Sequence, residues 1–276
     1  MFFKRFILLL ILILLVGCSS EEVPDVKEAI EPTPLVEEIV VSNDMPVLRY
    51  DVPEMVVEDD EGKFSGHDDS EDPYETCPDP LILETPVDLK PVTSILYPGQ
   101  ERGGDFKPHG GFRFDNSDSK ISVKMPMDGF LTRGSRYIHG GELQYMFDFK
   151  NSCGISIRFG HLKVLSPKLE KIAITLPEAK VDDSRTTELK NEKFIIGEEI
   201  ASEIGFTNNV FVDFGVYDNR QKNEASKTSQ LIKNHPSDLA EHAVCWFDWF
   251  SSENSAIIRG LPAGDGKNGK KSEYCK

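Results

Sequence analysis

Four side chains that can transfer protons, ligate a metal or bind a charged ligand stand in motifs rich in glycine and aromatic residues. His109 and Arg113 belong to the motif PHGGFRF, His161 to IRFGHL and Asp213 to VFVDFGV. An imidazole titrates near neutral pH and ligates metals, whereas a carboxylate accepts hydrogen bonds and a guanidinium only donates them. Such residue types make the four side chains candidates for a functional site.

The same residues also have structural interpretations. His109 precedes two glycines and is compatible with a simple turn, and His161 follows a predicted strand and is compatible with a structural histidine. A metal site is the third interpretation, in which His109, His161 and Asp213 are ligands and Asp115 supplies a fourth. The sequence alone leaves these interpretations open.

The order and spacing of five motifs over about residues 95–220 resemble those of the lysostaphin/LytM-type zinc peptidases. The motifs are PHGGFRF, VKMPMDGF, IRFGHL, GEEIA followed by IGFTN, and VFVDFGV. Members of that family typically show H-x-G-x-D, P-x-D/G-G-x-V, Y-x-H-L, G-x-x-I-x-x-x-G-x-T/S-G and H-x-H-F in this order. The resemblance implies the duplicated-hybrid-motif β-fold and, in intact members, a zinc-dependent hydrolase of cell-wall peptides.

The chain departs from the family pattern at the metal site. The resemblance implies that His109 keeps a zinc-ligand position and that His161 keeps the position of a histidine that handles the attacking water. Arg113 stands where the family has a ligating Asp, Phe211 where it has a catalytic His, and Asp213 where it has the last ligating His. Arginine cannot ligate zinc, so we expect no cofactor, and zinc on His109 and Asp213 only as the alternative.

Since Arg113 brings a permanent positive charge to the metal position, we predict that it replaces zinc and pairs with Asp213, in the bidentate geometry that arginine and carboxylate favour. The resemblance then implies a noncatalytic domain, because family members without the zinc site often serve in binding or regulation. It also implies that His109, Arg113, His161 and Asp213 line the ligand-binding groove, with His161 as the catalytic residue only if the protein is an enzyme. The alternative is a zinc-dependent peptide hydrolase with atypical ligands, and a purely structural envelope protein is the third class.

Short runs of β-branched and aromatic residues separated by glycine and asparagine predict an all-β domain, mainly antiparallel and sandwich-like or barrel-like. One helix is compatible with residues 237–250, where Trp246, Trp249 and Phe250 would share a face for core packing or for stacking on a carbohydrate or peptide. The predicted strands cover 120–125, 129–132, 144–150, 154–159 and 210–217.

Four cysteines remain after the leader, at positions 77, 153, 245 and 275. An even number in an exported protein predicts disulfides, and four cysteines allow three connectivities. Chain proximity favours Cys77–Cys153 with Cys245–Cys275. There is no CxxC pair, so a zinc-thiolate site is not expected.

The N-terminus has the pattern of an export signal followed by a lipidation site. Lys4 and Arg5 precede an apolar run that ends in LVGC, which resembles the lipobox of prokaryotic lipoproteins. We predict a signal peptide over 1–17 and lipidation of Cys18, with a membrane as partner through the acyl chains. An ordinary secretory signal and a retained transmembrane helix are the alternatives. The expected location is outside the cytoplasm, anchored at the cell surface or the periplasmic face.

The next segment, 18–75, reads as an acidic disordered tether that precedes a domain over 76–276. Residues 21–75 hold 19 acidic and three basic side chains, a formal charge of −16 that equals the charge of the whole chain. Such composition does not bury enough apolar surface to offset the entropy of ordering. No basic patch is present, so nucleic acid is not an expected partner. The expected partners of the domain are an envelope polymer, a peptide or an envelope protein.

Overall fold

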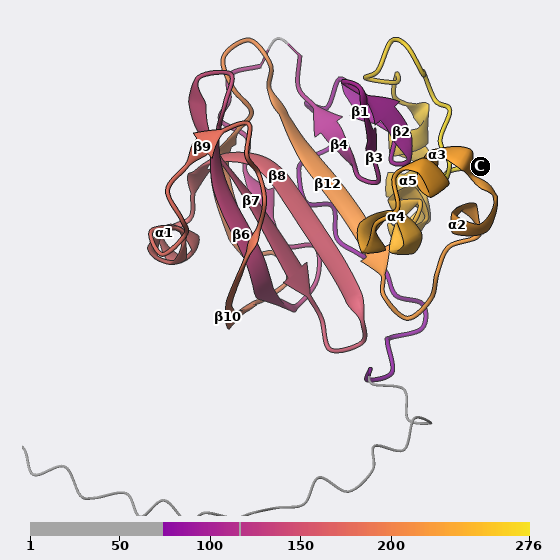
Figure 1. Cartoon of the computed structure of the whole chain (residues 1–276), viewed down its shortest axis with the longest axis horizontal. Helices are drawn as coiled ribbons and strands as arrows, with labels where there is room; N and C mark the ends of the chain where they lie inside the picture. Colours follow the sequence, from indigo (N-terminus) through magenta and orange to yellow (C-terminus); the bar gives the residue numbers. More distant parts are fainter. Residues whose placement is uncertain (1–73, 116) are drawn as a thin grey trace, which may run out of the picture. The chain divides into compact units, whose positions relative to one another are not determined.

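One large β-sheet organises the part of the chain that the computed structural model describes, residues 74–115 and 117–276 (Figure 1). Its strands run in the order β1-β4-β12-β8-β7-β6-β10, with β11 paired to β8 and β5, and β9 paired to β6. A separate two-stranded sheet is formed by β2 and β3. The strands are β1 (Ser94–Leu96), β2 (Gln100–Arg102), β3 (Asp105–Lys107), β4 (Gly110–Arg113), β5 (Val123–Lys124), β6 (Gly129–His139), β7 (Glu142–Lys150), β8 (Ile155–Leu165), β9 (Lys180–Val181), β10 (Thr187–Phe194), β11 (Glu199–Ile204) and β12 (Phe211–Asp218).

Strand β12 is an inner strand of the sheet, and all eight of its residues are buried. Its run of valine, phenylalanine and tyrosine suits a strand covered on both faces. It pairs antiparallel with β4 on one side and with β8 on the other. In this register Asp213 stands opposite Gly111 of β4 and Gly160 of β8. The segments around positions 110, 160 and 213 therefore meet although they are far apart in sequence.

One core cluster joins the strands of the sheet to the segment before β1, to residues 165–176 and to the C-terminal segment. Apolar side chains alternate along β7 and β8, which form an antiparallel meander with β6. Trp246 is fully buried and lies 5.1 Å from Phe112 and 5.2 Å from Phe214, measured between ring centroids. Offset and edge contacts of this kind add to the hydrophobic gain of burying the rings. The largest fully buried side chains include Phe112, Phe114, Phe147, Phe149, Phe159, Phe194, Phe214, Tyr217, Trp246 and Phe247.

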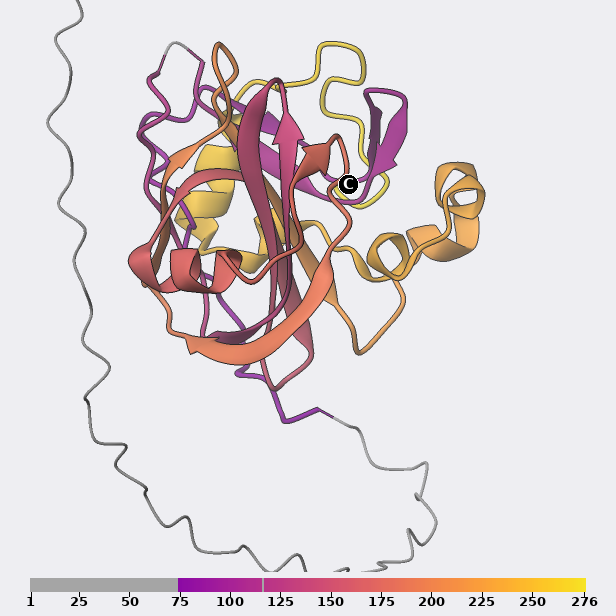
Figure 2. The same cartoon turned by 60° about the vertical axis from the view of Figure 1, so that its left-hand side comes forward.

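The helices are short, and they replace the single C-terminal helix expected over 237–250. That expectation is wrong because the chain is extended at Ala243, where it bridges Tyr217, and the amide of Val244 donates to Val216 of β12. In both views α2 and α3 stand away from α1, which packs on β6 and β8 (Figures 1 and 2). The helices are α1 (Pro167–Ala173), α2 (Ala225–Thr228), α3 (Gln230–Asn234), α4 (Asp238–His242), the 3₁₀-helix η1 (Trp246–Trp249) and α5 (Ser252–Gly260).

The mainly β prediction is confirmed, and the aromatic run around Trp246 packs in the core. The barrel-like form is not found, since no pairing joins β1 to β10 within the described residues and the sheet stays open. The signal peptide, Cys18 and almost all of the tether lie outside the described residues. In the part of the chain that is described, no helix is long and apolar enough to cross a membrane.

Both disulfides form as chain proximity favours, Cys77–Cys153 and Cys245–Cys275. Disulfides persist in oxidising compartments and are rare in the cytosol. The protein therefore belongs to an oxidising environment outside the cytoplasm.

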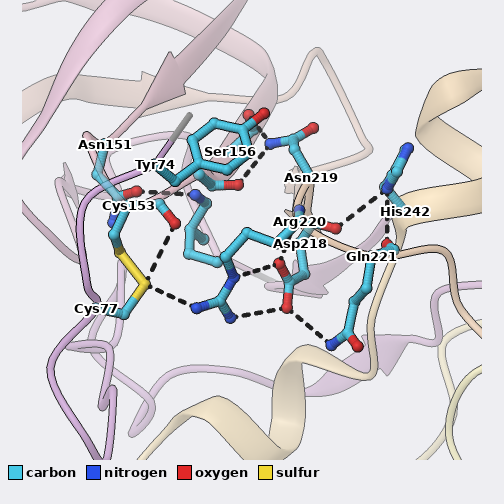
Figure 3. Close-up of polar contacts among 12 residues, drawn as sticks. Tyr74, Cys77, Asn151, Cys153, Ser156, Asp218, Asn219, Arg220, Gln221 and His242 are labelled. Carbon is cyan, nitrogen blue, oxygen red and sulfur yellow. Dashed lines mark hydrogen bonds and ion pairs between the residues drawn. A yellow bond between two sulfur atoms is a disulfide. The ribbon is translucent and has the colours of Figure 1, made fainter. Parts of the chain in front are cut away.

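The Cys77–Cys153 bridge is part of a polar cluster that attaches the start of the domain to the turn between β7 and β8 and to the end of β12 (Figure 3). Arg220 donates to Sγ of Cys77 at 3.1 Å and forms two hydrogen bonds with the buried carboxylate of Asp218, at 2.7 and 2.8 Å. Asn219 donates to the carbonyl of Gly154 next to Cys153. The end of β12 and the turn between β7 and β8 are thus joined to the same point.

We expect the two disulfides to contribute unequally to stability. They close 76 and 30 residues of chain, respectively. Loop-closure entropy in the unfolded state predicts stabilisation of about 4.5 kcal/mol for the longer loop and about 3.7 kcal/mol for the shorter one. Chemical denaturation of the paired serine variants C77S/C153S and C245S/C275S measures both losses. A larger loss in C245S/C275S would contradict this account.

Candidate functional site

The sheet brings His109, His161 and Asp213 into direct contact. His109 immediately precedes β4, His161 lies in β8, and Asp213 lies in β12 between them. Oδ2 of Asp213 is 3.2 Å from Nε2 of His109 and 3.4 Å from Nε2 of His161. The three side chains keep 12–14% of their surface exposed, so solvent reaches a site that is otherwise enclosed.

Glycines make room for this contact. A Cβ on Gly160 would lie 3.3 Å from Oδ2 of Asp213, and a Cβ on Gly111 would lie only 2.4 Å from the carbonyl of Val212. On β12 itself, a Cβ on Gly215 would lie 3.0 Å from Cβ of His109. The glycines of the sequence motifs therefore leave the carboxylate uncovered by side chains from the paired strands.

His161 is held in a backbone conformation that few non-glycine residues adopt, with φ near 60°. Its amide donates to the hydroxyl of Tyr137, on β6, at 3.3 Å. Its Nδ1 lies 3.1 Å from Oε1 of the fully buried Gln144, on β7, whose Nε2 donates to the carbonyl of Gly205. Two strands that do not contain His161 therefore hold it, β6 at its backbone amide and β7 at its ring, and such over-determination is what maintains a strained residue.

The site favours a neutral imidazole beside an ionised carboxylate. Burial lowers the pKa of His161 to about 4, with Asp213 opposing the shift and His139, His109 and Lys107 adding to it. Burial alone would raise the pKa of Asp213, but the two imidazoles and the hydrogen bond from His109 outweigh it and hold that pKa below its ordinary value. Asp213 therefore carries a negative charge at a poorly solvated position.

Arg113 does not pair with Asp213, so the predicted ion pair in place of zinc is wrong. Arg113 stands opposite Phe211 in the β4–β12 ladder, and its Nη2 lies 3.0 Å from Oδ1 of Asp115. The arginines whose charges interact with Asp213 are Arg102 of β2, which donates to the carbonyl of His109 at 2.9 Å, and Arg158 of β8. Burial lowers the pKa of Arg102 while Asp213 opposes that shift.

Aromatic side chains surround His161 on the other side. The ring of Phe211 lies 4.3 Å from the imidazole, and the ring of Phe206 lies 6.2 Å from it, between centroids. His139 lies 5.4 Å from His161 and 5.1 Å from Phe206, and its Nδ1 lies 2.8 Å from Asp182. Phe211 stands at the position where the resembling family has a catalytic histidine. Here its ring packs against the imidazole of His161.

Sequence reasoning missed Gln144, Tyr137, Phe206 and Arg102. Gln144 had a visible signal, because it is a polar residue in the alternating pattern of a predicted strand. Phe206 stood in the motif IGFTN, but its place beside His161 was not predicted, and Arg102 had no signal, since it comes from a hairpin that meets the site only in the folded chain.

The residues present do not fit the zinc centre that the resemblance implies. Within the described residues, no group of three or more His, Cys, Asp or Glu side chains is arranged to hold a metal ion. A zinc-ligating imidazole normally donates its second N–H to a carboxylate or carbonyl, whereas Nδ1 of His109 is buried without a hydrogen-bond partner in the described structure. Nε2 of His109 is engaged with Asp213.

Comparison of the chain with models of protein families, with curated proteins and with solved structures gave no match. The similarity to lysostaphin/LytM-type peptidases therefore remains a prediction from the five motifs, and the site is interpreted on its own geometry.

We expect the depressed pKa of His161 to make the domain less stable in mild acid. A histidine titrates near 6.5 in the unfolded chain and at about 4 here. Between these values the unfolded state binds more protons, so the free energy of unfolding rises with pH, by at most about 1.4 kcal/mol per pH unit from this group. The stabilisation is complete above about pH 6.5 and is lost as the pH falls toward 4.

Urea titrations at pH 4.5 to 7.5 measure this slope. The variant His161→Asn is the comparison, because asparagine tolerates a positive φ and carries no titrating ring. We expect a shallower dependence in the variant. Equal slopes in both proteins would contradict the assignment.

Proposed function

We propose that this protein is a noncatalytic binding module of the cell envelope. In this proposal, the domain uses the partly exposed side chains of His109, His161 and Asp213 to recognise an envelope polymer, a peptide or a partner protein. Acyl chains on Cys18 hold it at a membrane, and the acidic segment that follows serves as a spacer. The expected location is the cell surface or the periplasmic face, in keeping with an oxidising environment.

The observation that carries the proposal is the direct contact of His109 with Asp213, beside a His161 packed on Phe211. In the resemblance, a hydrolase needs a ligand where Arg113 stands and a proton-transferring histidine where Phe211 stands. A general acid or base typically contributes 10²–10⁴ in rate, and a phenyl ring supplies none of it. The arrangement is better suited to holding a polar group than to activating water.

Zinc binding and hydrolysis provide the first test. The purified full chain is exposed to zinc, desalted and subjected to elemental analysis, and it is incubated with isolated cell-wall polymer while released amino groups are counted. We expect much less than one zinc per chain and no release above a protein-free control. Near-stoichiometric zinc with peptide release that a chelator abolishes would replace the proposal with the alternative of an atypical metallohydrolase.

Binding is the second test. We expect the full chain to sediment with isolated cell-wall polymer, and the double variant H161N/D213N to lose at least tenfold in affinity. The matched control is Asp182→Asn, which removes an exposed carboxylate that pairs with His139 and leaves Asp213 in place. Equal binding by both variants would mean that this site does not carry the interaction.

A further inference from the structure

The hydrogen-bond arrangement at His161 fixes which ring nitrogen carries the hydrogen. The carbonyl of Gly205 only accepts, so the Gln144 atom 2.6 Å from it is the amide nitrogen. The Gln144 oxygen therefore faces Nδ1 of His161 at 3.1 Å, and Nδ1 must donate. In the neutral imidazole, Nε2 is then a bare acceptor.

That bare acceptor faces another acceptor. Nε2 of His161 lies 3.4 Å from Oδ2 of Asp213, and both atoms carry lone pairs. Oδ2 receives a hydrogen bond from Nε2 of His109, but no donor stands between Asp213 and His161 in the described residues. With the imidazole neutral, two partly buried acceptors at this separation repel each other, and a bridging group with N–H or O–H donors removes that repulsion.

The surroundings favour a positively charged donor with an apolar body. Phe211 and Phe206 flank His161, and the faces of such rings attract cations while their bulk accommodates methylene groups. The ionised carboxylate of Asp213 supplies the negative charge with which such a cation pairs.

A metal ion meets these requirements less well than an organic cation. Nε2 of His109 is occupied by its hydrogen bond to Asp213, which leaves two free acceptor atoms, and a zinc site uses at least three protein ligands. A primary ammonium group needs only acceptors in its reach, because it has three N–H donors. Its third N–H can remain in solvent at the exposed side of the site.

We propose that the site binds a primary ammonium group, which donates to Oδ2 of Asp213 and Nε2 of His161 while its alkyl chain lies against Phe206 and Phe211. The ligand class is a lysine-like or other diamino side chain carried by a peptide or polymer. This inference rests on the proposed binding function and specifies what the module recognises.

The direct test uses n-pentylammonium chloride as the probe and pentan-1-ol as its neutral counterpart. Nitrogen and proton chemical shifts of the His161 ring in the full chain report binding at pH 7.5. We expect saturable shifts with millimolar affinity for pentylammonium and at least tenfold weaker binding of pentanol. Equal binding of the two probes would overturn the inference, as would a doubly protonated His161 ring in the free protein.

Variants separate charge from shape. Asp213→Asn keeps the side-chain size and removes the charge, and we expect at least a tenfold loss for pentylammonium, whereas the control Asp182→Asn retains binding within twofold. Gly160→Ala keeps every charge but places a methyl group 3.3 Å from Oδ2, so it also weakens binding. Thermal unfolding confirms that each variant is folded. Unchanged affinity in Asp213→Asn would overturn the inference.

Acetylated polymer distinguishes this inference from the proposed function. We expect sedimentation of the full chain with cell-wall polymer to fall at least tenfold when the amino groups of the polymer are acetylated. If the chain binds native and acetylated polymer equally well, the binding module stands and the ammonium inference fails. If the chain binds neither polymer but binds pentylammonium, the ammonium site stands and its polymer ligand is excluded.

Discussion

The double pairing of β12 is the interaction on which both the core and the site depend. Its antiparallel ladders with β4 and β8 bury every residue of the strand and bring three distant glycine-rich segments side by side. The same register that places Phe214 against the core aromatics places Asp213 between Gly111 and Gly160. A slip of one residue would turn the carboxylate to the opposite face and expose the apolar set. Core and site are therefore specified together.

A charged group on a central strand imposes a requirement on its neighbours. A buried carboxylate is costly unless it is hydrogen-bonded and near positive charge. Here one imidazole donates to it and Arg102 lies close enough to stabilise its charge, while the second imidazole is fixed by Gln144 as an acceptor. Asp213 thus accepts fewer hydrogen bonds than a buried carboxylate usually does. Such a residue is typical of functional rather than purely structural positions.

The sequence was informative where local patterning and chain proximity decide the outcome. The alternation in 144–150 and the apolar run in 210–217 predicted β7 and β12 to within about two residues, and both disulfides followed from proximity. The single helix predicted over 237–250 was wrong. Trp246, Trp249 and Phe250 have helical spacing, but pairing of the chain with β12 overrides it. The predicted Arg113–Asp213 ion pair was wrong because the distance between the two residues depends on strand register, and Arg113 pairs with Asp115 instead. Arg102 and Gln144 required the tertiary fold.

The Cys77–Cys153 bridge has a mechanical consequence for a chain held from its N-terminal side. A force applied upstream of Cys77 enters the domain at that residue and passes through a covalent bond to the turn between β7 and β8. Hydrogen bonds between Arg220 and Asp218 extend this attachment to the end of β12. The load is thus carried to β7, β8 and β12, which are inner strands of the sheet, and does not peel an edge strand away.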